Sequence, residues 1–189
     1  MSRHAGPPRA DDAPSVPEPT FAERARTLAY LGRTGTLATL SRRHPGHPFA
    51  SVMPYALDDA GRPLFLISSM AMHTQNLEAD PRASLLVTQP DWTGDPLAAG
   101  RLTLMGEARR VPQADAASAR EGYLTRHERA RYWADFEDFG LWRLEVANSL
   151  TVAVRRGRID ANFRRAALAE CPRLGRNAQR GRPLPAHGV

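Results

Sequence analysis

The sequence contains no lysine, so all 26 of its basic residues are arginine. Lysine codons are rich in A and T, and a gene rich in G and C produces this composition without any demand from function. The absence still limits the available chemistry. A clamp for phosphate or carboxylate must use arginine, histidine, hydroxyl or backbone N–H groups.

The sequence also has a single cysteine, Cys171, and no long apolar run. One thiol excludes an internal disulfide and any zinc or iron–sulfur site built from several cysteines of one chain. No segment approaches the roughly 18–20 consecutive apolar residues that span a bilayer, and the residues after Met1 show no apolar core of a secretory signal. We therefore expect a cytoplasmic protein with no membrane partner.

Charge divides the chain into unlike parts. Residues 1–150 carry 17 arginines and 18 acidic residues, whereas residues 151–189 carry nine arginines and two acidic residues. Five prolines lie close together near the start of the sequence, which favours a flexible arm. We predict an arm over residues 1–19, a folded domain over residues 20–147 and a basic, arginine-rich tail over residues 148–189.

Short alternating segments dominate the folded part. Thr20 and Glu23 form a capping box that starts a helix, and Gly32 ends it. Helices are also expected over residues 72–78 and 113–126. Six segments have strand periodicity and are separated by turns or short connections: residues 35–41, 49–57, 64–67, 82–87, 101–111 and 139–145. The pattern predicts a mainly β protein with flanking helices, a six-stranded antiparallel barrel.

Common catalytic motifs are missing from the sequence. It has no nucleophile elbow, Walker loop or dinucleotide glycine fingerprint. His44 and His47 lie three residues apart in a Pro–Gly turn with no carboxylate or thiol nearby, so we predict no metal site. Asp58 and Asp59 are typical of a turn.

One segment, residues 67–77, runs from a strand end into a helix N-terminus and is rich in short polar side chains. Free N–H groups and the partial positive charge at a helix start suit a phosphate. Alternatively, Ser69 and Thr74 only cap the helix. The sequence leaves both interpretations open.

Several segments between residues 21 and 146 have an order and spacing that are specific in combination: Thr36–Ser41, Pro48–Asp58, Gly61–Ser68, His73–Leu77, Asp80–Val87, Asp95–Leu97, Arg101–Gly106, Phe136 and Phe139–Leu144. This set resembles the pyridoxamine 5′-phosphate oxidase-related family of FMN-binding split barrels. Within that family, it is most similar to the haem-utilisation-like bacterial branch.

The resemblance implies a homodimer of six-stranded split barrels, with FMN in a groove at the dimer interface. The implied cofactor-binding residues are Ser51, Val52, Met53 and Pro54 along the flavin and ribityl chain, Ile67 and Ser68 closing on the flavin, His73, Thr74 and Asn76 at the phosphate, and Arg101 reaching the flavin. Oxidases of the family carry an Arg–Lys pair where this chain has Met72 and His73. Neutral hydrogen bonds would therefore replace a charged clamp.

By this resemblance we predict an FMN-binding flavoprotein, an oxidoreductase whose small-molecule substrate the sequence does not identify. The flavin would carry the redox chemistry, and no catalytic residue is assigned. The deazaflavin F420 and haem rank below FMN as cofactors. Two alternatives stay open: a haem-binding or haem-utilisation protein on the same fold, and a flavin-binding module without redox turnover.

The tail departs from the family pattern. In the haem-utilisation branch, haem ligation depends on this C-terminal region. Either a changed reading frame after about residue 149 or a genuine basic extension accounts for the arginine-rich sequence. A genuine extension would neutralise phosphates without sequence preference. Phe163 is its only aromatic residue, so we do not expect a nucleic-acid partner.

Overall fold

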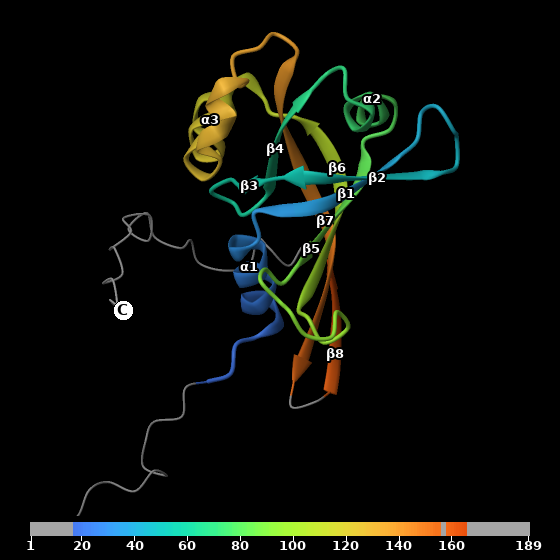
Figure 1. The fold of residues 1–189 in the computed structure, drawn as a ribbon, viewed down its shortest axis with the longest axis vertical. Coiled ribbons are helices and arrows are strands. Elements are labelled where there is room, and N and C mark those ends of the chain that lie inside the picture. The colour runs from blue at the N-terminus through green and yellow to red at the C-terminus, as the bar shows by residue number, and fades with distance from the viewer. Residues whose placement is uncertain (1–16, 156–157, 166–189) are drawn as a thin grey trace, which may run out of the picture.

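The computed structural model describes the backbone over residues 17–155 and 158–165 and the side chains over residues 17–150. This part of the chain contains eight strands (Figure 1): β1 (Thr34–Leu40), β2 (Pro48–Pro54), β3 (Ala56–Leu57), β4 (Pro63–Ser68), β5 (Arg82–Thr88), β6 (Arg101–Arg110), β7 (Phe139–Arg155) and β8 (Arg158–Arg165). The helices are α1 (Phe21–Leu31), α2 (Met72–Ala79), α3 (Gln113–Arg126) and the 3-10 helix η2 (Glu128–Tyr132).

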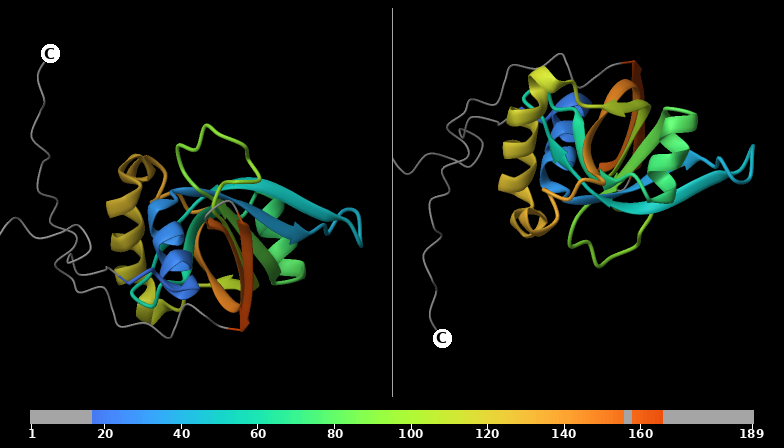
Figure 2. Two further views of the ribbon diagram at one scale, coloured as in Figure 1. Left: turned by 90° about the horizontal axis from the view of Figure 1, so that it is seen from below. Right: turned by 90° about the horizontal axis from the view of Figure 1, so that it is seen from above.

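The strands are antiparallel and follow the order β2-β1-β5-β6-β7-β4-β3. A single residue, Tyr55, joins β2 to β3 at the two ends of this order. The sheet therefore curls back on itself with helices around it (Figure 2). This confirms the predicted mainly β fold with flanking helices.

The order contains seven strands rather than the six expected. The difference arises at Tyr55, inside the strand predicted over residues 49–57. Its backbone N–H donates to Arg33 O at 3.1 Å, and the strand divides there into β2 and β3. β7 also continues past the expected end at residue 145, to Arg155.

The second half of β7 pairs with β8, which lies beside the main order. Residues 148–155 and 158–165 thus form strand pairs within the segment predicted as a basic tail. Residues 166–189 of that tail and residues 1–16 of the predicted arm lie outside the described residues.

A bulge in β7 accompanies the bend of this long strand, because Ala147 has no register partner on β6. The register between β6 and β7 shifts at Met105 and Gly106. A Cβ atom on Gly106 would lie only 1.9 Å from Glu145 O, so no other residue fits without moving the backbone. Before the bend β7 pairs with β4, and after it β7 pairs with β8.

Helix α1 begins at the predicted capping box. The Glu23 N–H donates to Thr20 Oγ1 at 3.2 Å, and the Thr20 N–H donates to Glu23 Oε2 at 2.7 Å. Such a cap stabilises a helix by about 1 kcal/mol. Ala25, Leu28 and Ala29 face the interior at helical spacing and are buried, so α1 packs into the main core.

The core has two clusters. The main cluster lies inside the curled sheet: Ala25, Leu28, Ala29, Leu37, Met53, Tyr55, Phe65, Ile67, Leu77, Ala83, Leu85, Val87, Leu102, Leu104, Ala108, Trp142 and Leu144. The second cluster lies between α3 and the strands β3 and β4: Ala56, Leu64, Leu66, Ala119, Tyr123, Leu124 and Ala130. Tyr55 and Ala56 are adjacent in sequence but belong to different clusters, so the break after β2 also separates the two cores.

No helix among the described residues is long and apolar enough to cross a membrane.

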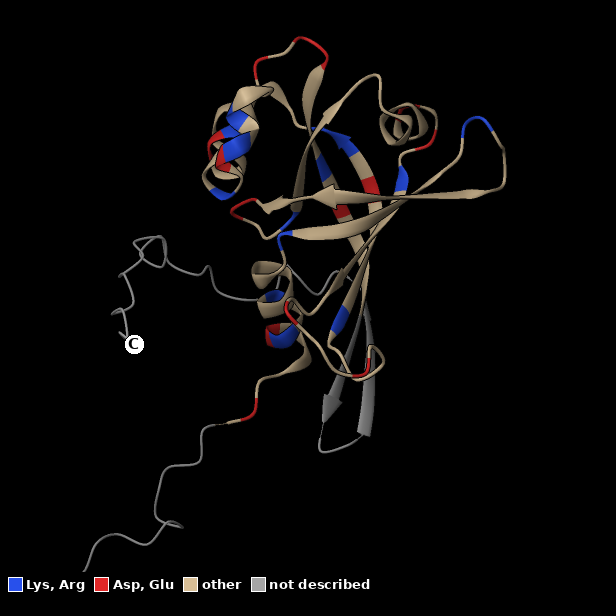
Figure 3. Ribbon diagram, in the orientation of Figure 1, with Lys and Arg blue, Asp and Glu red and all other residues tan. Residues whose placement is uncertain are grey.

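Charged side chains gather on α3, and two arginines mark the projecting tip between β1 and β2 (Figure 3).

Candidate functional site

The residues singled out in the sequence lie on four elements: β2, the end of β4, α2 and the start of β6. Helix α2 packs against β1 and β2, beside the projecting β1–β2 hairpin (Figure 1). The fold therefore brings the β2 residues close to the α2 residues, which lie about twenty positions later in the sequence.

The four predicted β2 residues do not line one surface. Side chains alternate along a strand: Met53 is buried and Ser51 half-buried, whereas Val52 is 76% exposed and Pro54 is exposed. Ser51 and Met53 point inward, and Val52 and Pro54 point to the opposite side of the strand.

Among the described side chains, His73 and Ser51 make the polar contact that joins predicted site residues of α2 and β2. His73 Nδ1 lies 3.4 Å from Ser51 Oγ. Burial lowers the pKa of His73, which favours the neutral imidazole. The fully buried side-chain N and O atoms that lack a partner in the described part of the chain are Thr74 Oγ1, Arg126 Nε and Trp142 Nε1. His73 Nε2 is not fully buried and has no hydrogen-bond partner among the described residues, so it is open to solvent.

Two further α2 residues are completely buried and serve the packing of the helix. Asn76 Oδ1 accepts from the Arg42 N–H at 2.9 Å, and its Nδ2 donates to Thr39 Oγ1 at 3.0 Å. Asn76 thus ties α2 to the end of β1. Thr74 is buried beside it with its hydroxyl oxygen unpaired.

The interpretation of Ser69 and Thr74 as caps of α2 is wrong, because no side chain caps this helix and Thr74 Oγ1 has no partner among the described residues. Ala71 is the N-cap residue of α2 and makes no side-chain cap bond. Ser68 Oγ instead donates to Asp138 Oδ2 and accepts from the Met70 N–H. Ile67 is 3% exposed inside the main core. Ser68 therefore shapes the connection before α2.

Arg101 lies away from the other predicted residues. It pairs in register with Thr88, and its Nη1 donates to Leu97 O at 3.0 Å. Because α2 leads almost directly into the start of β5 at Arg82, Thr88 lies at the far end of that strand. The structure does not bring Arg101 together with His73.

Sequence reasoning missed a row of uncharged residues across the outward face of five strands. Val52 lies opposite Thr36, Thr36 opposite Leu86, Leu86 opposite Thr103, and Thr103 opposite Leu150. Val52 and Leu86 are 76% and 37% exposed. The alternation within each strand indicates its two faces. Only the register between strands shows that these five residues form one row, which we call the outward row.

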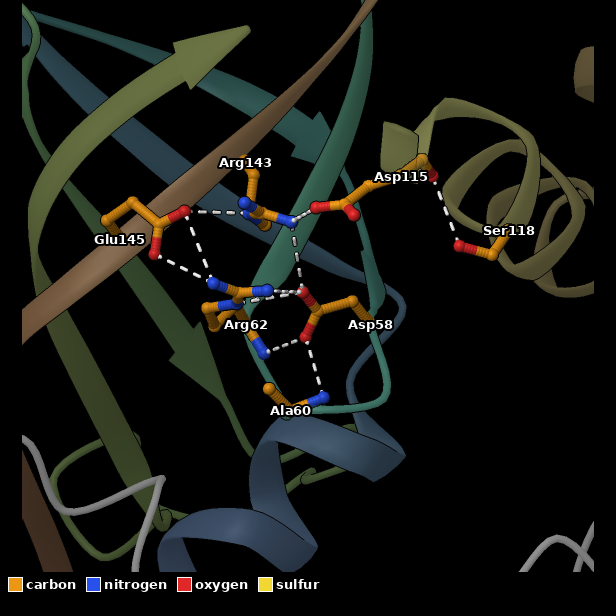
Figure 4. Close-up of polar contacts among 7 residues, drawn as sticks. All are labelled: Asp58, Ala60, Arg62, Asp115, Ser118, Arg143 and Glu145. Atoms are coloured by element: carbon orange, nitrogen blue, oxygen red, sulfur yellow. Dashed lines mark hydrogen bonds and ion pairs between the residues drawn. The ribbon is translucent and has the colours of Figure 1, made fainter. Parts of the chain in front are cut away.

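The densest charged cluster is an ion-pair network around Arg143 (Figure 4). Arg143 is 9% exposed and contacts Asp115 at 2.9 Å, Glu145 at 2.7 Å and Asp58 at 3.7 Å. Arg62 contacts Asp58 at 2.8 Å and Glu145 at 3.1 Å. The network joins the β3–β4 turn, β7 and α3. Each of its charges has a partner, so none of them is free to bind a substrate.

An open depression of about 360 Å³ lies between α3 and the strands β4 and β7. Its walls are mostly apolar, with Leu66, Ala117 and Phe139 among them, and Arg120 at one side is paired with Asp135 at 2.5 Å. None of the predicted site residues lines this depression. The described residues also contain no group of three or more histidine, cysteine, aspartate or glutamate side chains that could hold a metal ion.

The model of the CREG beta-barrel family matches residues 17–153. The chain belongs to this family. It is 38% identical over 125 residues to the non-canonical heme oxygenase HOZ of Arabidopsis thaliana, which is 65% of this chain but 37% of HOZ. The chain therefore spans little more than a third of that relative.

Two solved structures extend the comparison. A heme binding protein from Mycobacterium smegmatis superposes with a TM-score of 0.70 and 41% identity, over 78% of this chain and 59% of that protein. HutZ, the heme storage protein of Vibrio cholerae, superposes with a TM-score of 0.53 and 26% identity, over 64% of this chain and 86% of HutZ. The expected split-barrel fold is confirmed, and the expected haem-utilisation branch fits these relatives.

These relatives correct the cofactor prediction. FMN as the main cofactor is wrong, because HOZ, the Mycobacterium smegmatis protein and HutZ are all named for haem. The alternative of a haem protein on the same fold is better supported than a flavin-dependent oxidoreductase. The family resemblance predicted the fold correctly. The prediction drawn from it placed FMN above haem as the cofactor, and that order is wrong.

Proposed function

We propose that this protein binds haem. The observation that carries the proposal is its 41% identity to the heme binding protein of Mycobacterium smegmatis over 78% of the chain. The 38% identity to HOZ supports it independently over much of the same domain.

The described residues fit a haem group in their chemistry. Haem iron in proteins takes an axial ligand from histidine, cysteine, methionine or tyrosine. The described part of the chain offers four histidines: His44, His47, His73 and His127. It also exposes large apolar side chains that a porphyrin would cover, among them Met70 at 75%. When bound, haem would supply an iron centre for oxygen or electron chemistry.

We also propose that the protein is a homodimer and that the outward row lies in the contact between the two copies. The row is uncharged and crosses five strands in register. Exposed, contiguous apolar surface is typical of protein interfaces. A two-fold pair of such rows would bring identical, self-complementary surfaces together.

Oxidative degradation of haem is a second candidate function. The similarity to a non-canonical heme oxygenase favours it. Since the chain spans 37% of that relative, binding is the primary proposal and degradation the further one.

The test of binding is a titration of the purified full chain with hemin, followed by the Soret absorbance. We expect a shifted Soret band that saturates at one hemin per chain or per dimer, and iron-free protoporphyrin IX serves as the control for porphyrin contact alone. A spectrum that stays that of free hemin would refute haem binding.

Degradation has a test of its own. The hemin complex is given a reductant and oxygen, and the rate at which its Soret band is lost is compared with the rate for free hemin.

Sedimentation measurements test the dimer. Leu86→Arg places a charge in the outward row and should give a monomer, while Tyr132→Arg at a residue that is 80% exposed should leave the dimer intact. A wild-type protein that sediments as a monomer at micromolar concentration contradicts the dimer.

A further inference from the structure

Two arginines join the end of α1 to the end of α3. Arg33, which follows α1, donates from Nη2 to the carbonyl oxygen of Arg126, the last residue of α3. Arg126 donates from its own Nη2 to Tyr30 O and, at 2.5 Å, to Gly32 O. Arginine near a helix C-terminus commonly bonds the last carbonyl groups in this way. Arg126 therefore caps α1, and Arg33 caps α3.

This capping uses one nitrogen of each guanidinium group, which offers five N–H donors in total. Arg126 Nε is fully buried without a partner, which is costly for an N–H group. Arg126 Nη1, Arg33 Nε and Arg33 Nη1 also have no hydrogen-bond partner among the described residues. The pair therefore keeps donors for a further acceptor.

No carboxylate in the described part of the chain forms an ion pair with either arginine. Burial lowers the pKa of Arg126, and the charge of Arg33 lowers it further. Burial also lowers the pKa of His127, and both arginine charges act in the same direction. Arg143, by contrast, contacts three carboxylates. Capping needs one N–H group from each residue, so it does not account for two unbalanced charges at one place.

The approach to this arginine pair is open. The Arg33 side chain is exposed, and Tyr30 and Leu31 at the end of α1 are 47% and 54% exposed. Arg126 Cζ lies over the Tyr30 ring, 5.6 Å from its centroid. The ring thus covers one face of the guanidinium and leaves its edge free to donate. The N–H groups along such an edge match two oxygens of one phosphate or carboxylate group.

We propose that Arg33 and Arg126 form a binding site for an oxyanion, the phosphate or carboxylate group of a small molecule. Its oxygens accept from the N–H groups that capping leaves unused, and its charge balances the pair. The bound oxyanion also bridges the ends of α1 and α3. This site does not depend on the proposed haem binding, and its test contains no hemin.

The test is a calorimetric titration of the full chain with inorganic phosphate and, separately, with acetate, at an ionic strength held constant with chloride. We expect the wild type to bind at least one of the two saturably, and the preferred anion distinguishes a phosphate site from a carboxylate site. Arg33→Gln should bind it about tenfold more weakly, because a hydrogen bond to a charged group contributes about that factor. Arg129→Gln removes the same charge from an exposed position on η2 and should bind like the wild type.

Arg126→Lys separates contact with the anion from damage to the fold. Lysine keeps the positive charge and a donor for the α1 carbonyl groups but lacks the planar fork, so we expect a folded protein with weaker binding. The saturating anion should raise the melting temperature of the wild type and Arg129→Gln more than that of Arg33→Gln. The absence of saturable binding by the wild type overturns the inference. Equal affinities of wild type and Arg33→Gln, or an equal rise in melting temperature with chloride alone, overturn it as well.

Discussion

His127 holds the backbone of Tyr55, with its Nε2 2.7 Å from the Tyr55 carbonyl oxygen. A carbonyl oxygen only accepts, so Nε2 carries the proton and donates. His127 ends α3, and Tyr55 separates β2 from β3. The bond therefore fastens the helix of the second cluster to the point where the sheet closes.

We expect the protein to lose stability at mildly acidic pH. Burial lowers the pKa of His127 and of His73 below 6.5, so the unfolded chain takes up protons more readily than the folded one. This stabilisation is fully present above about pH 6.5 and is lost as the pH falls through the lower folded-state values. Urea unfolding between about pH 5 and pH 7.5 measures it. His127→Gln keeps an N–H donor and should show a shallower pH dependence, and an equal slope in both proteins contradicts this role.

At alkaline pH, two tyrosines should titrate late. Burial raises the pKa of Tyr55 and of Tyr123 to about 12 in each case. Stability is therefore full below about pH 10 and decreases as the pH rises towards 12. Because the chain has no lysine, no lysine ammonium group adds to the change of stability in this range, and tyrosinate absorbance measures the late phase directly. Tyr55→Phe and Tyr123→Phe should each reduce it, and a single early phase in the wild type contradicts the assignment.

Tyr55→Phe should also lower the free energy of unfolding at neutral pH. The buried Tyr55 hydroxyl donates to Ala29 O at 2.6 Å, and loss of such a bond costs about 1–2 kcal/mol. Tyr132→Phe is the matched control, since its side chain is 80% exposed. Equal stability of the two variants would show that the Tyr55 bond contributes little.

Removing Arg143 should destabilise the domain much more than removing its neighbour across the sheet. Arg143 and Arg109 are register partners on β7 and β6, but Arg143 contacts three carboxylates and its side chain is 10% exposed. Arg143→Gln leaves Asp115 without its ion pair and leaves Asp58 and Glu145 with Arg62 alone, at a cost of roughly 1–3 kcal/mol. Arg109 pairs with Glu107 at the surface, so Arg109→Gln should change stability by less than about 1 kcal/mol. Denaturant unfolding distinguishes the two, and similar losses contradict a structural role for the network.

Two glycines should respond to alanine in opposite directions. A Cβ at Gly106 would lie 1.9 Å from Glu145 O, whereas one at Gly122 in α3 would contact nothing within 4 Å. Gly106→Ala must therefore displace the β6–β7 bulge and should leave little folded protein at 37 °C. Gly122→Ala should raise the free energy of unfolding by roughly 0.5–1 kcal/mol, because alanine favours a helix more than glycine does. Thermal melts followed by circular dichroism compare both, and a stable Gly106→Ala protein contradicts the packing at the bulge.

Local sequence features predicted the elements that depend on local physics. The capping box at Thr20 and Glu23 starts α1 as expected, and the expected helix over residues 113–126 coincides with α3. Features that depend on distant residues could not be predicted in this way. Asn76 satisfies its amide with Arg42 and Thr39, which lie 34 and 37 positions away. The break at Tyr55 depends on Arg33, Ala29 and His127, so alternation alone predicted one continuous strand.

The candidate site shows the same division. The helix start indicated a candidate phosphate site over residues 67–77, and the family resemblance then assigned His73 to that phosphate. The pairing of His73 with Ser51 needs the packing of α2 on β2. Thr74 and Asn76 have polar side chains of the kind that bind ligands, yet both are 0% exposed.

β2 lies at one end of the sheet order and is bounded by Pro48 and Pro54. Proline has no backbone N–H to offer, so it weakens the pairing of a further strand at both ends of this one. Copies of the chain that associate through the outward row would stop at two, whereas copies that added strand to strand would keep growing. The two prolines therefore favour finite assembly over fibre growth, which matters most at high concentration.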